Sequence, residues 1–210
     1  MRLDPAGIPF IVGALVFGLL AGTAFAWPLA VPFAVLAAFF AFFFRDPDRH
    51  AINPIEENAV LAPADGRVLV AGPAVADQAP PGNWQQISIF LSPLDVHVNR
   101  VPVSGRVTRV SVTRGRFLPA YRPDAARHNE RSEIWLDHHG QIVVARQVVG
   151  ILARRVVCRL ESGAEVRAGD RLGIMKFGSR MDVFLAPAAT ISVHVGQSVR
   201  GGETVIAVLH

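Results

Sequence analysis

A long stretch without any charged residue, at positions 5–44, most constrains what this chain can fold into. About twenty apolar residues cross the hydrocarbon core of a bilayer, so the stretch is too long for one comfortable span. Trp27 and Pro28 interrupt it near its middle. We therefore predict an N-terminal transmembrane helical hairpin, with helices at about 8–26 and 29–44 joined by a tight turn.

Basic residues flank this apolar stretch on both sides. Arg2 precedes it, and Arg45 and Arg49 follow it. Because basic residues favour the cytoplasmic side of a membrane, we expect both ends of the hairpin, and the domain that follows, on the cytoplasmic face of the cell membrane. A cleaved signal peptide is the alternative, since residues 24–26 (Ala-Phe-Ala) have the small-x-small form of a cleavage site. The thin charged region before them and the second apolar segment after them favour the hairpin.

The composition limits the other functional classes. The chain has 210 residues and a formal net charge of +4, but its basic residues are scattered, so we predict no nucleic-acid partner. The mild positive charge suits either an anionic lipid surface or ordinary solubility. The single cysteine, Cys158, excludes an internal disulfide and a cysteine metal cluster, and its apolar neighbours indicate a buried thiol. His138, His139 and Gly140 look like a hairpin turn, and we predict no metal site.

From about Asn53 onward, short β-type runs alternate with Gly and Pro. This pattern predicts a mostly β (α+β) domain, a compact β-sandwich or barrel-like fold. We place the domain boundary so that residues 1–46 form the membrane anchor and 47–210 the main domain. The segment 115–129 is expected to be exposed or to cover a site. The predicted strands are Arg67–Val70, Gln86–Leu91, Arg106–Val112, Glu133–Leu136, Ile142–Val149, Val156–Leu160 and Val205–Leu209.

Two internal repeats stand out in this domain. Residues 163–172 and 196–205 share the pattern G-x-x-V-R-x-G-acid-x-aliphatic, and residues 63–68 resemble residues 102–107. Such units are similar to the half-motifs of lipoyl- and biotinyl-type β-sandwiches, where glycines turn the chain between short strands.

This similarity supplies an alternative function, a biotin or lipoate carrier. Biotin carriers present a Met-Lys pair at a hairpin tip, and Met175 and Lys176 lie between the two repeats. The residues that follow, 177–179 (Phe-Gly-Ser), do not match a carrier. A carrier also has no use for the acidic and histidine motifs considered next.

The dipeptide Gly178-Ser179 carries the chemistry that we regard as most informative. Glycine offers an unhindered carbonyl and tolerates strained φ values, and the hydroxyl of the next residue can attack that carbonyl. The amide then becomes an ester, elimination leaves dehydroalanine, and hydrolysis gives an N-terminal pyruvoyl group and ammonia. Most Gly-Ser pairs are simply turns, so the argument depends on the surrounding motifs.

Four motifs in order resemble the phosphatidylserine decarboxylase family in its short bacterial form, whose members carry a membrane hairpin. Together they cover nearly all of the predicted soluble domain. They are residues 62–66 (APADG), residues 93–100 (PLDVHVNR) followed by Pro102, residues 129–131 (NER) and residues 177–179 (FGS).

The resemblance implies a self-cleaving proenzyme. Cleavage between Gly178 and Ser179 would give a β chain, 1–178, and an α chain, 179–210, that stay associated. Ser179 would become the pyruvoyl cofactor, form a Schiff base with the amine of phosphatidylserine and serve as the electron sink during loss of carbon dioxide. The product would be phosphatidylethanolamine. The family tends to form homodimers, and an inactive membrane-anchored homologue is a further alternative.

Two more residues receive roles from the resemblance. Asp65 corresponds to the acid that supports self-cleavage, although an aspartate before glycine is also a common turn residue. His97 corresponds to the histidine of the decarboxylation step, which we interpret as the proton donor to the α-carbon.

The chain departs from the longer family members at Arg100, where they carry a second histidine that activates the serine. Arginine stays protonated and cannot act as this base. His97 itself, another histidine such as His194, or water must replace it. Arg100 is instead a candidate to hold the substrate carboxylate or phosphate.

The motif Asn129, Glu130 and Arg131 leaves two interpretations open. These residues either bind the serine head group or form a structural salt bridge. Lys176 likewise either stabilises a phosphate or is simply exposed.

Overall fold

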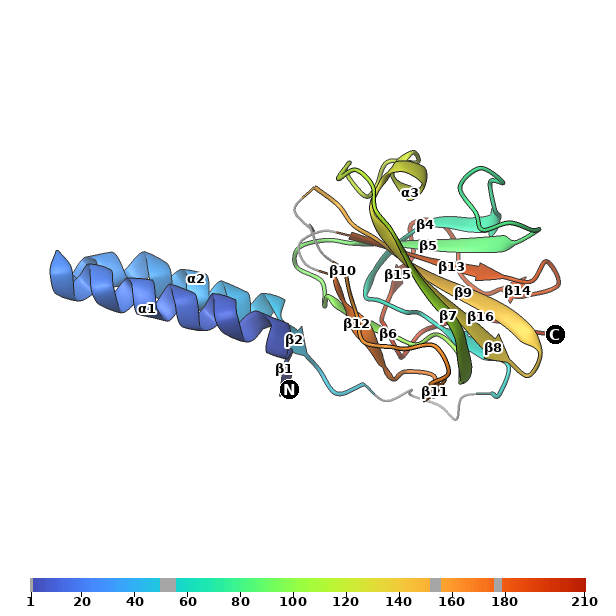
Figure 1. The fold of residues 1–210 in the computed structure, drawn as a ribbon, viewed down its shortest axis with the longest axis horizontal. Coiled ribbons are helices and arrows are strands. Elements are labelled where there is room, and N and C mark those ends of the chain that lie inside the picture. The colour runs from blue at the N-terminus through green and yellow to red at the C-terminus, as the bar shows by residue number, and fades with distance from the viewer. Residues whose placement is uncertain (1, 50–55, 152–155, 176–178) are drawn as a thin grey trace. The chain divides into compact units, whose positions relative to one another are not determined.

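The computed structural model describes residues 2–49, 56–151, 156–175 and 179–210 (Figure 1). The chain divides into two compact units, Met1–Asp48 and Arg49–His210.

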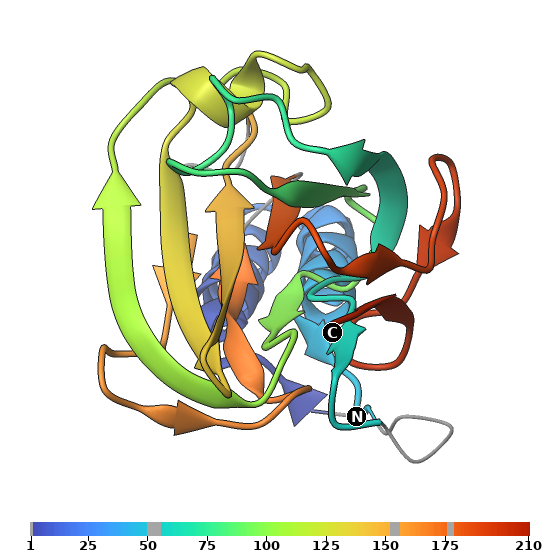
Figure 2. The same cartoon turned by 90° about the vertical axis from the view of Figure 1, so that its right-hand side faces the viewer.

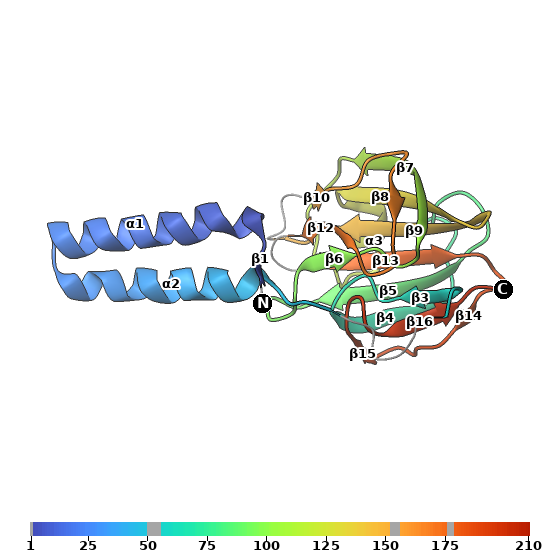
Figure 3. The same ribbon diagram turned by 90° about the horizontal axis from the view of Figure 1, so that it is seen from below.

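The N-terminal unit consists mainly of two apolar helices that lie side by side and run antiparallel (Figure 3). Aromatic rings join them, with the centroids of Phe10 and Phe40 5.4 Å apart and those of Phe17 and Phe33 6.4 Å apart. The elements are β1 (Arg2–Leu3), η1 (Pro5–Gly7), α1 (Ile8–Ala24), η2 (Trp27–Leu29), α2 (Ala30–Phe43) and β2 (Arg45–Asp46).

Both helices are slightly shorter than predicted, because the residues between them form the 3-10 turn η2. Pro28 lies in its first turn, where a missing N–H costs nothing. One helical segment of the described chain, Pro5–Ala24, is long and apolar enough to cross a bilayer, and the segment Trp27–Phe43 is shorter. Many apolar side chains of the segment Pro5–Ala24 are exposed, including Phe17 and Leu19. This apolar N-terminal helix is compatible with membrane association.

The second unit is mostly β, as predicted. Eight antiparallel strands form one sheet that curls into a half-barrel (Figure 2). In order across the sheet they are β11 (Glu165–Val166), β7 (Gly105–Thr113), β8 (Arg131–His138), β9 (Gln141–Val148), β13 (Ser179–Leu185), β5 (Gln85–Leu91), β4 (Gly66–Pro73) and β15 (Ser198–Val199).

Two three-stranded sheets complete this unit. The first has the order β10 (Val156–Cys158), β12 (Arg171–Met175) and β6 (Val98–Arg100), and the second β14 (Thr190–Ile191), β16 (Val205–Val208) and β3 (Ala59–Leu61). The only helix described in this unit is α3 (Ala125–His128), a single turn within the segment predicted as a loop.

The eight-stranded sheet is built from two matching halves that meet between β9 and β13. One half reads β11-β7-β8-β9 and the other β15-β4-β5-β13. Val166 pairs with Gly105 in the first half as Val199 pairs with Gly66 in the second. At both glycines φ is close to +150°, and an added Cβ would lie 2.1 Å from a carbonyl oxygen, so only glycine fits. The repeats seen in the sequence therefore occupy equivalent places.

The halves differ in how their two central strands are connected. A two-residue turn, His139 and Gly140, joins β8 to β9, and both residues have positive φ, as a type I′ turn requires. This confirms the hairpin turn that was predicted at residues 138–140. In the other half, β5 and β13 pair in the same way, with Leu91 opposite Ser179. The chain between them, 92–178, forms the whole first half. One half is thus inserted into the hairpin of the other.

The two faces of the half-barrel differ in character. The inner face carries the apolar core, to which the paired strands contribute residues such as Ile89, Leu136 and Val183. The outer face carries buried ion pairs, including Arg180 with Asp182 at 2.6 Å and Arg146 with Glu133 at 2.6 Å. Burial lowers the pKa of Arg146, and the nearby carboxylates of Asp182 and Glu133 oppose that shift.

Candidate functional site

Ser179 is the first residue of β13 and is fully buried. It pairs with Leu91, the last residue of β5. Its side chain lies on the inner face together with that of Met181, because alternate residues of a strand share a face. Among the described residues its hydroxyl has no hydrogen-bond partner. Gly178 and Lys176 lie outside the described residues.

Asp65 directly precedes β4, on the other side of β5 from Ser179. Its Oδ1 accepts a hydrogen bond from the N–H of Gly201 at 2.8 Å, and its Oδ2 lies 2.6 Å from Nη2 of Arg49. Burial raises the pKa of Asp65, and the contacts with Gly201 and Arg49 partly offset that rise, whereas nearby Asp95 adds to it. Arg49, which stood out in the sequence only as a basic residue that follows the apolar stretch, pairs with Glu203 as well.

A cavity of about 540 Å³ opens beside Asp65. It contains acidic and basic side chains, so it suits a ligand that carries both charges. The ring of Tyr121, in the segment 115–129, packs edge-on against Phe90, one of the residues that line this cavity, with 6.0 Å between ring centroids. The lining residues used below are Asp65, Arg67, Phe90, Ser92, Asp95 and Arg200.

His97 is fully buried and follows a short turn that begins at Ser92. Its Nδ1 lies 2.9 Å from the carbonyl oxygen of Asp95. Because a carbonyl only accepts, Nδ1 carries the hydrogen of this contact, and in the neutral form of the ring Nε2 holds the lone pair. The carbonyl of His97 accepts the N–H of Met175, four residues before Ser179. The structure therefore brings the His97, Asp65 and Ser179 segments together at the end of β5.

Arg100 lies in β6 but on the opposite face of this strand from His97. Its Nη1 donates to the carbonyl of Gly169 at 3.0 Å, and its backbone N–H donates to Pro63. The exposed His194 lies on the loop before β15. Arg100 is thus not a base for Ser179, and His194 is exposed whereas Ser179 is fully buried.

The Asn129 motif has a structural part in the fold. The amide of Asn129 accepts from the N–H of Leu118 and donates to the carbonyls of Leu118 and Val149, so it fastens the segment 115–129 to the sheet. Arg131 contacts the carbonyl of Arg127 and lies 3.6 Å from Glu133.

The backbone of Glu130 completes the same anchoring. The carbonyl of Glu130 accepts a hydrogen bond from the N–H of Val149, and the N–H of Glu130 donates to the carbonyl of Arg116. These contacts favour the structural interpretation of residues 129–131 over head-group binding.

Sequence reasoning missed two buried polar residues near Ser179. Gln147 in β9 donates through Nε2 to Oδ1 of Asn99 in β6, at 2.8 Å. The available signal was a glutamine that alternates with the apolar Val143 and Ala145 along one face of the predicted strand. Cys158, predicted to be buried, is half-buried, and burial raises the pKa of its thiol. No group of three or more His, Cys, Asp or Glu side chains in the described ranges is arranged to hold a metal ion.

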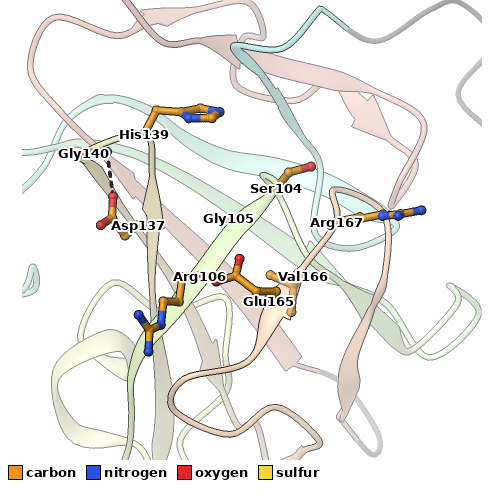
Figure 4. Close-up of a pocket in the computed structure, with 9 residues that line it drawn as sticks. All are labelled: Ser104, Gly105, Arg106, Asp137, His139, Gly140, Glu165, Val166 and Arg167. Carbon is orange, nitrogen blue, oxygen red and sulfur yellow. Dashed lines mark hydrogen bonds between the residues drawn. The ribbon is translucent and has the colours of Figure 1, made fainter.

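A second cavity, of about 620 Å³, occupies the equivalent place in the other half (Figure 4). Ser104, Gly105 and Arg106 line it where Asp65, Gly66 and Arg67 line the first. The intact turn at His139 and Gly140 also lines it, and the N–H of Gly140 donates to Oδ1 of Asp137 at 2.8 Å.

Comparisons with known proteins agree with this arrangement. The family model for phosphatidylserine decarboxylase matches residues 36–207. A phosphatidylserine decarboxylase proenzyme from Pelodictyon phaeoclathratiforme is 43% identical over 86% of this chain and 84% of its own length. Proenzymes of the same name from Gluconobacter oxydans and Nitrosomonas europaea are 41% and 40% identical, each over 97% of this chain and 93% and 94% of their own lengths. The chain therefore belongs to the phosphatidylserine decarboxylase family.

Proposed function

We propose that this protein cleaves itself between Gly178 and Ser179 and then decarboxylates phosphatidylserine to phosphatidylethanolamine. One observation carries the proposal. A fully buried serine without a hydrogen-bond partner in the described chain begins a central strand, with Asp65 on the far side of the neighbouring strand and His97 beside the strand that leads to it.

The cleavage step needs a nucleophile and a proton acceptor. Oγ of Ser179 attacks the carbonyl carbon of Gly178, the peptide C–N bond breaks, and the hydroxyl proton ends on the freed α-amine of Ser179, which leaves an ester. Loss of the α-proton of Ser179 then expels the carboxylate of Gly178 and cuts the chain. Arg100 cannot take a proton, and His194 is exposed. We therefore assign the transfer to Nε2 of His97, the nitrogen left with a lone pair by the contact with Asp95.

The pyruvoyl group formed from Ser179 would supply the electron sink for loss of carbon dioxide. His97 would then return a proton to the α-carbon of the head group, as a general acid. The cavity beside Asp65 supports entry of the lipid head group, since Arg67 and Arg200 offer positive charge for its phosphate.

The cut chains would stay together. Strand β13, which begins the α chain, lies between β5 and β9 and pairs with both. Strands β15 and β16 of the α chain pair with β4 and β3. Backbone hydrogen bonds on both sides of β13 hold the chains without a covalent link. A homodimer stays a prediction of the resemblance.

The N-terminal unit, 1–46, would anchor the decarboxylase domain, 47–210, to the membrane that holds its substrate. The exposed apolar side chains of α1 and α2 support a membrane hairpin, and the basic residues at its ends support the cytoplasmic face. The two repeated units support the comparison with lipoyl-type half-motifs.

Mass spectrometry of the purified protein tests the proposal. We expect two chains, with an α chain that begins at residue 179 and lacks a free amine, and release of labelled carbon dioxide from phosphatidylserine in membranes. An uncut wild-type chain would reject the proposal. A mass gain on Lys176 would instead identify a carrier, and an uncut, unmodified chain an inactive homologue.

A further inference from the structure

Three buried polar atoms around the cleavage site have no partner in the described parts of the chain. They are Nδ2 of Asn99, Oε1 of Gln147 and Oγ of Ser179, and all three residues are 0% exposed. A buried polar group without a partner is costly, so such groups are rare unless a ligand completes them. Here one atom is a donor, one is an acceptor, and the hydroxyl can be either.

The strand registers place these atoms around one point. Gln147 pairs with Met181, and Ser179 lies two residues before Met181 on the same inner face. Diagonal neighbours across a strand pair are within reach of a long side chain. His97 lies two residues before Asn99, so both face the same way from β6. Gln147 is therefore a same-face neighbour of Ser179, and Asn99 is a same-face neighbour of His97.

The matching half of the sheet shows that the fold does not need polar residues here. By the equivalence of Gly105 with Gly66, Asn99 corresponds to Val60. By the equivalence of β9 with β13, Gln147 corresponds to Leu185. Both counterparts are fully buried and apolar. The fold packs these positions with hydrocarbon in one half, so the amides in the other half call for a functional explanation.

We propose that Asn99 and Gln147 bind the serine head group of the lipid, an inference that rests on the proposed function. Oε1 of Gln147 accepts a hydrogen bond from the head-group amine, and Nδ2 of Asn99 donates one to the carboxylate. The hydrogen bond between the two amides fixes which atom of each faces the ligand, because Nε2 of Gln147 and Oδ1 of Asn99 are already paired.

A neutral clamp suits this reaction. The carboxylate loses its charge as carbon dioxide forms, so a cation bound to it would stabilise the ground state more than the transition state. An amide orients the carboxylate without this penalty. Arg100, the candidate from the sequence for this contact, faces the other side of β6 and donates to Gly169.

Reductive trapping of amines on the processed enzyme tests the clamp without measuring turnover. Wild type and variants are incubated with cyanoborohydride and mixed micelles of phosphatidylserine or phosphatidylethanolamine, and the mass of the α chain reports the adduct. Asn99→Leu should slow trapping of phosphatidylserine about tenfold and leave phosphatidylethanolamine unchanged, since only the former has the carboxylate. Gln147→Leu should slow both about tenfold. Gln86→Leu, a buried glutamine on the outer face that donates to Ser88, is the matched control and should match wild type.

The outcomes separate this inference from the proposed function. If wild type forms no adduct because it is never cut, the proposed function fails. If wild type is trapped and Asn99→Leu keeps its preference between the two lipids, the clamp is wrong. Should the leucine variants remain uncut, the milder Asn99→Ser and Gln147→Met are measured in the same way. The proposal is overturned if Asn99→Ser keeps wild-type selectivity and Gln147→Met traps both lipids at the wild-type rate.

Discussion

The two halves of the eight-stranded sheet have the same strand order but different connections. In one half, β8 and β9 are joined by the turn at His139 and Gly140. In the other, β5 and β13 pair in the same register, yet the chain leaves after Leu91 and returns only at Ser179. The comparison suggests how a fold acquires a cleavable bond. Ser179 occupies the position that Gln141 holds in an ordinary hairpin, and in the sequence Gly178 precedes Ser179 as Gly140 precedes Gln141.

The two cavities carry different groups at equivalent positions. Ser104 lines one cavity where Asp65 lines the other, and His139 lies in the turn of one half where Ser92 follows the strand in the other. The half-buried carboxyl of Asp65 is thus matched by an uncharged serine. Substitutions made in pairs, one in each half, measure how far this asymmetry extends.

The largest difference is expected for the pair Ser179→Ala and Gln141→Ala. Without the hydroxyl no acyl shift is possible, so Ser179→Ala should stay a single chain of 22.6 kDa without detectable decarboxylation. The half-buried side chain of Gln141 donates to the carbonyl oxygen of His210 in the described hydrogen bonds, so its loss should leave cutting and activity intact. Intact-protein mass and carbon dioxide release measure both. Full activity of Ser179→Ala would show that the hydroxyl of Ser179 is not needed, and that the two halves do not differ in this way.

The next largest effect is expected at His97. His97→Gln should slow cleavage, because His97 is the proposed proton acceptor, and the chains that are cut should decarboxylate about 10²–10⁴-fold more slowly, the range for a lost general acid. Its equivalent position in the other half, the exposed Asn58, should tolerate alanine. The rate constant for carbon dioxide release under saturating lipid checks this. A fall of less than a few-fold would assign the proton transfer to another group.

A smaller effect, with a pH signature, is expected at Asp65. Burial raises its pKa above the ordinary 3.8, so the carboxyl takes up a proton at a higher pH than an exposed aspartate does. If its charged form supports cleavage, the cleavage rate should fall as the pH is lowered through that raised pKa. Asp65→Asn should cleave at least tenfold more slowly and lose this pH dependence, whereas Ser104→Ala should behave as wild type. Time courses on denaturing gels at a series of pH values decide the matter.

The smallest effect is expected at the intact turn. Gly140 has a φ of 84°, and an added Cβ would have no heavy atom within 4 Å, so only backbone strain opposes a side chain. Gly140→Ala should lower the free energy of unfolding by about 1 kcal/mol, as measured in urea with the uncut Ser179→Ala chain as background. Cleavage in the otherwise wild-type chain should be unaffected. A loss of cleavage would show that the two connections communicate.

Local features of the sequence predicted much of this architecture. The β-type runs, the repeats and the turn at His139 depend on alternation and on glycines, which act over a few residues. The boundaries moved where longer-range pairing extends a strand. Strand β4, predicted to end at Val70, continues to Pro73 because β5 pairs with it to that point.

The site was harder to predict, because its members meet through packing between sheets. The motifs identified Ser179, Asp65 and His97 as candidates, but nothing local links Gln147 to Asn99, which are joined only when β6 lies over the half-barrel. Arg49 was considered only as a topology signal, yet it forms an ion pair with Asp65. Asn129 was a motif residue whose three amide contacts join the loop, at Leu118, to Val149 at the end of β9.

The central position of β13 has a consequence for the lifetime of the mature enzyme. A cut immediately before it turns an inner strand into the start of a separate peptide, so global unfolding also becomes dissociation. Recovery after denaturation would then require two molecules to find each other, and its yield would depend on concentration. The precursor folds as one chain, whereas the product can only be reassembled. Maturation thus creates the reactive group and removes the ability of the protein to refold as a single chain.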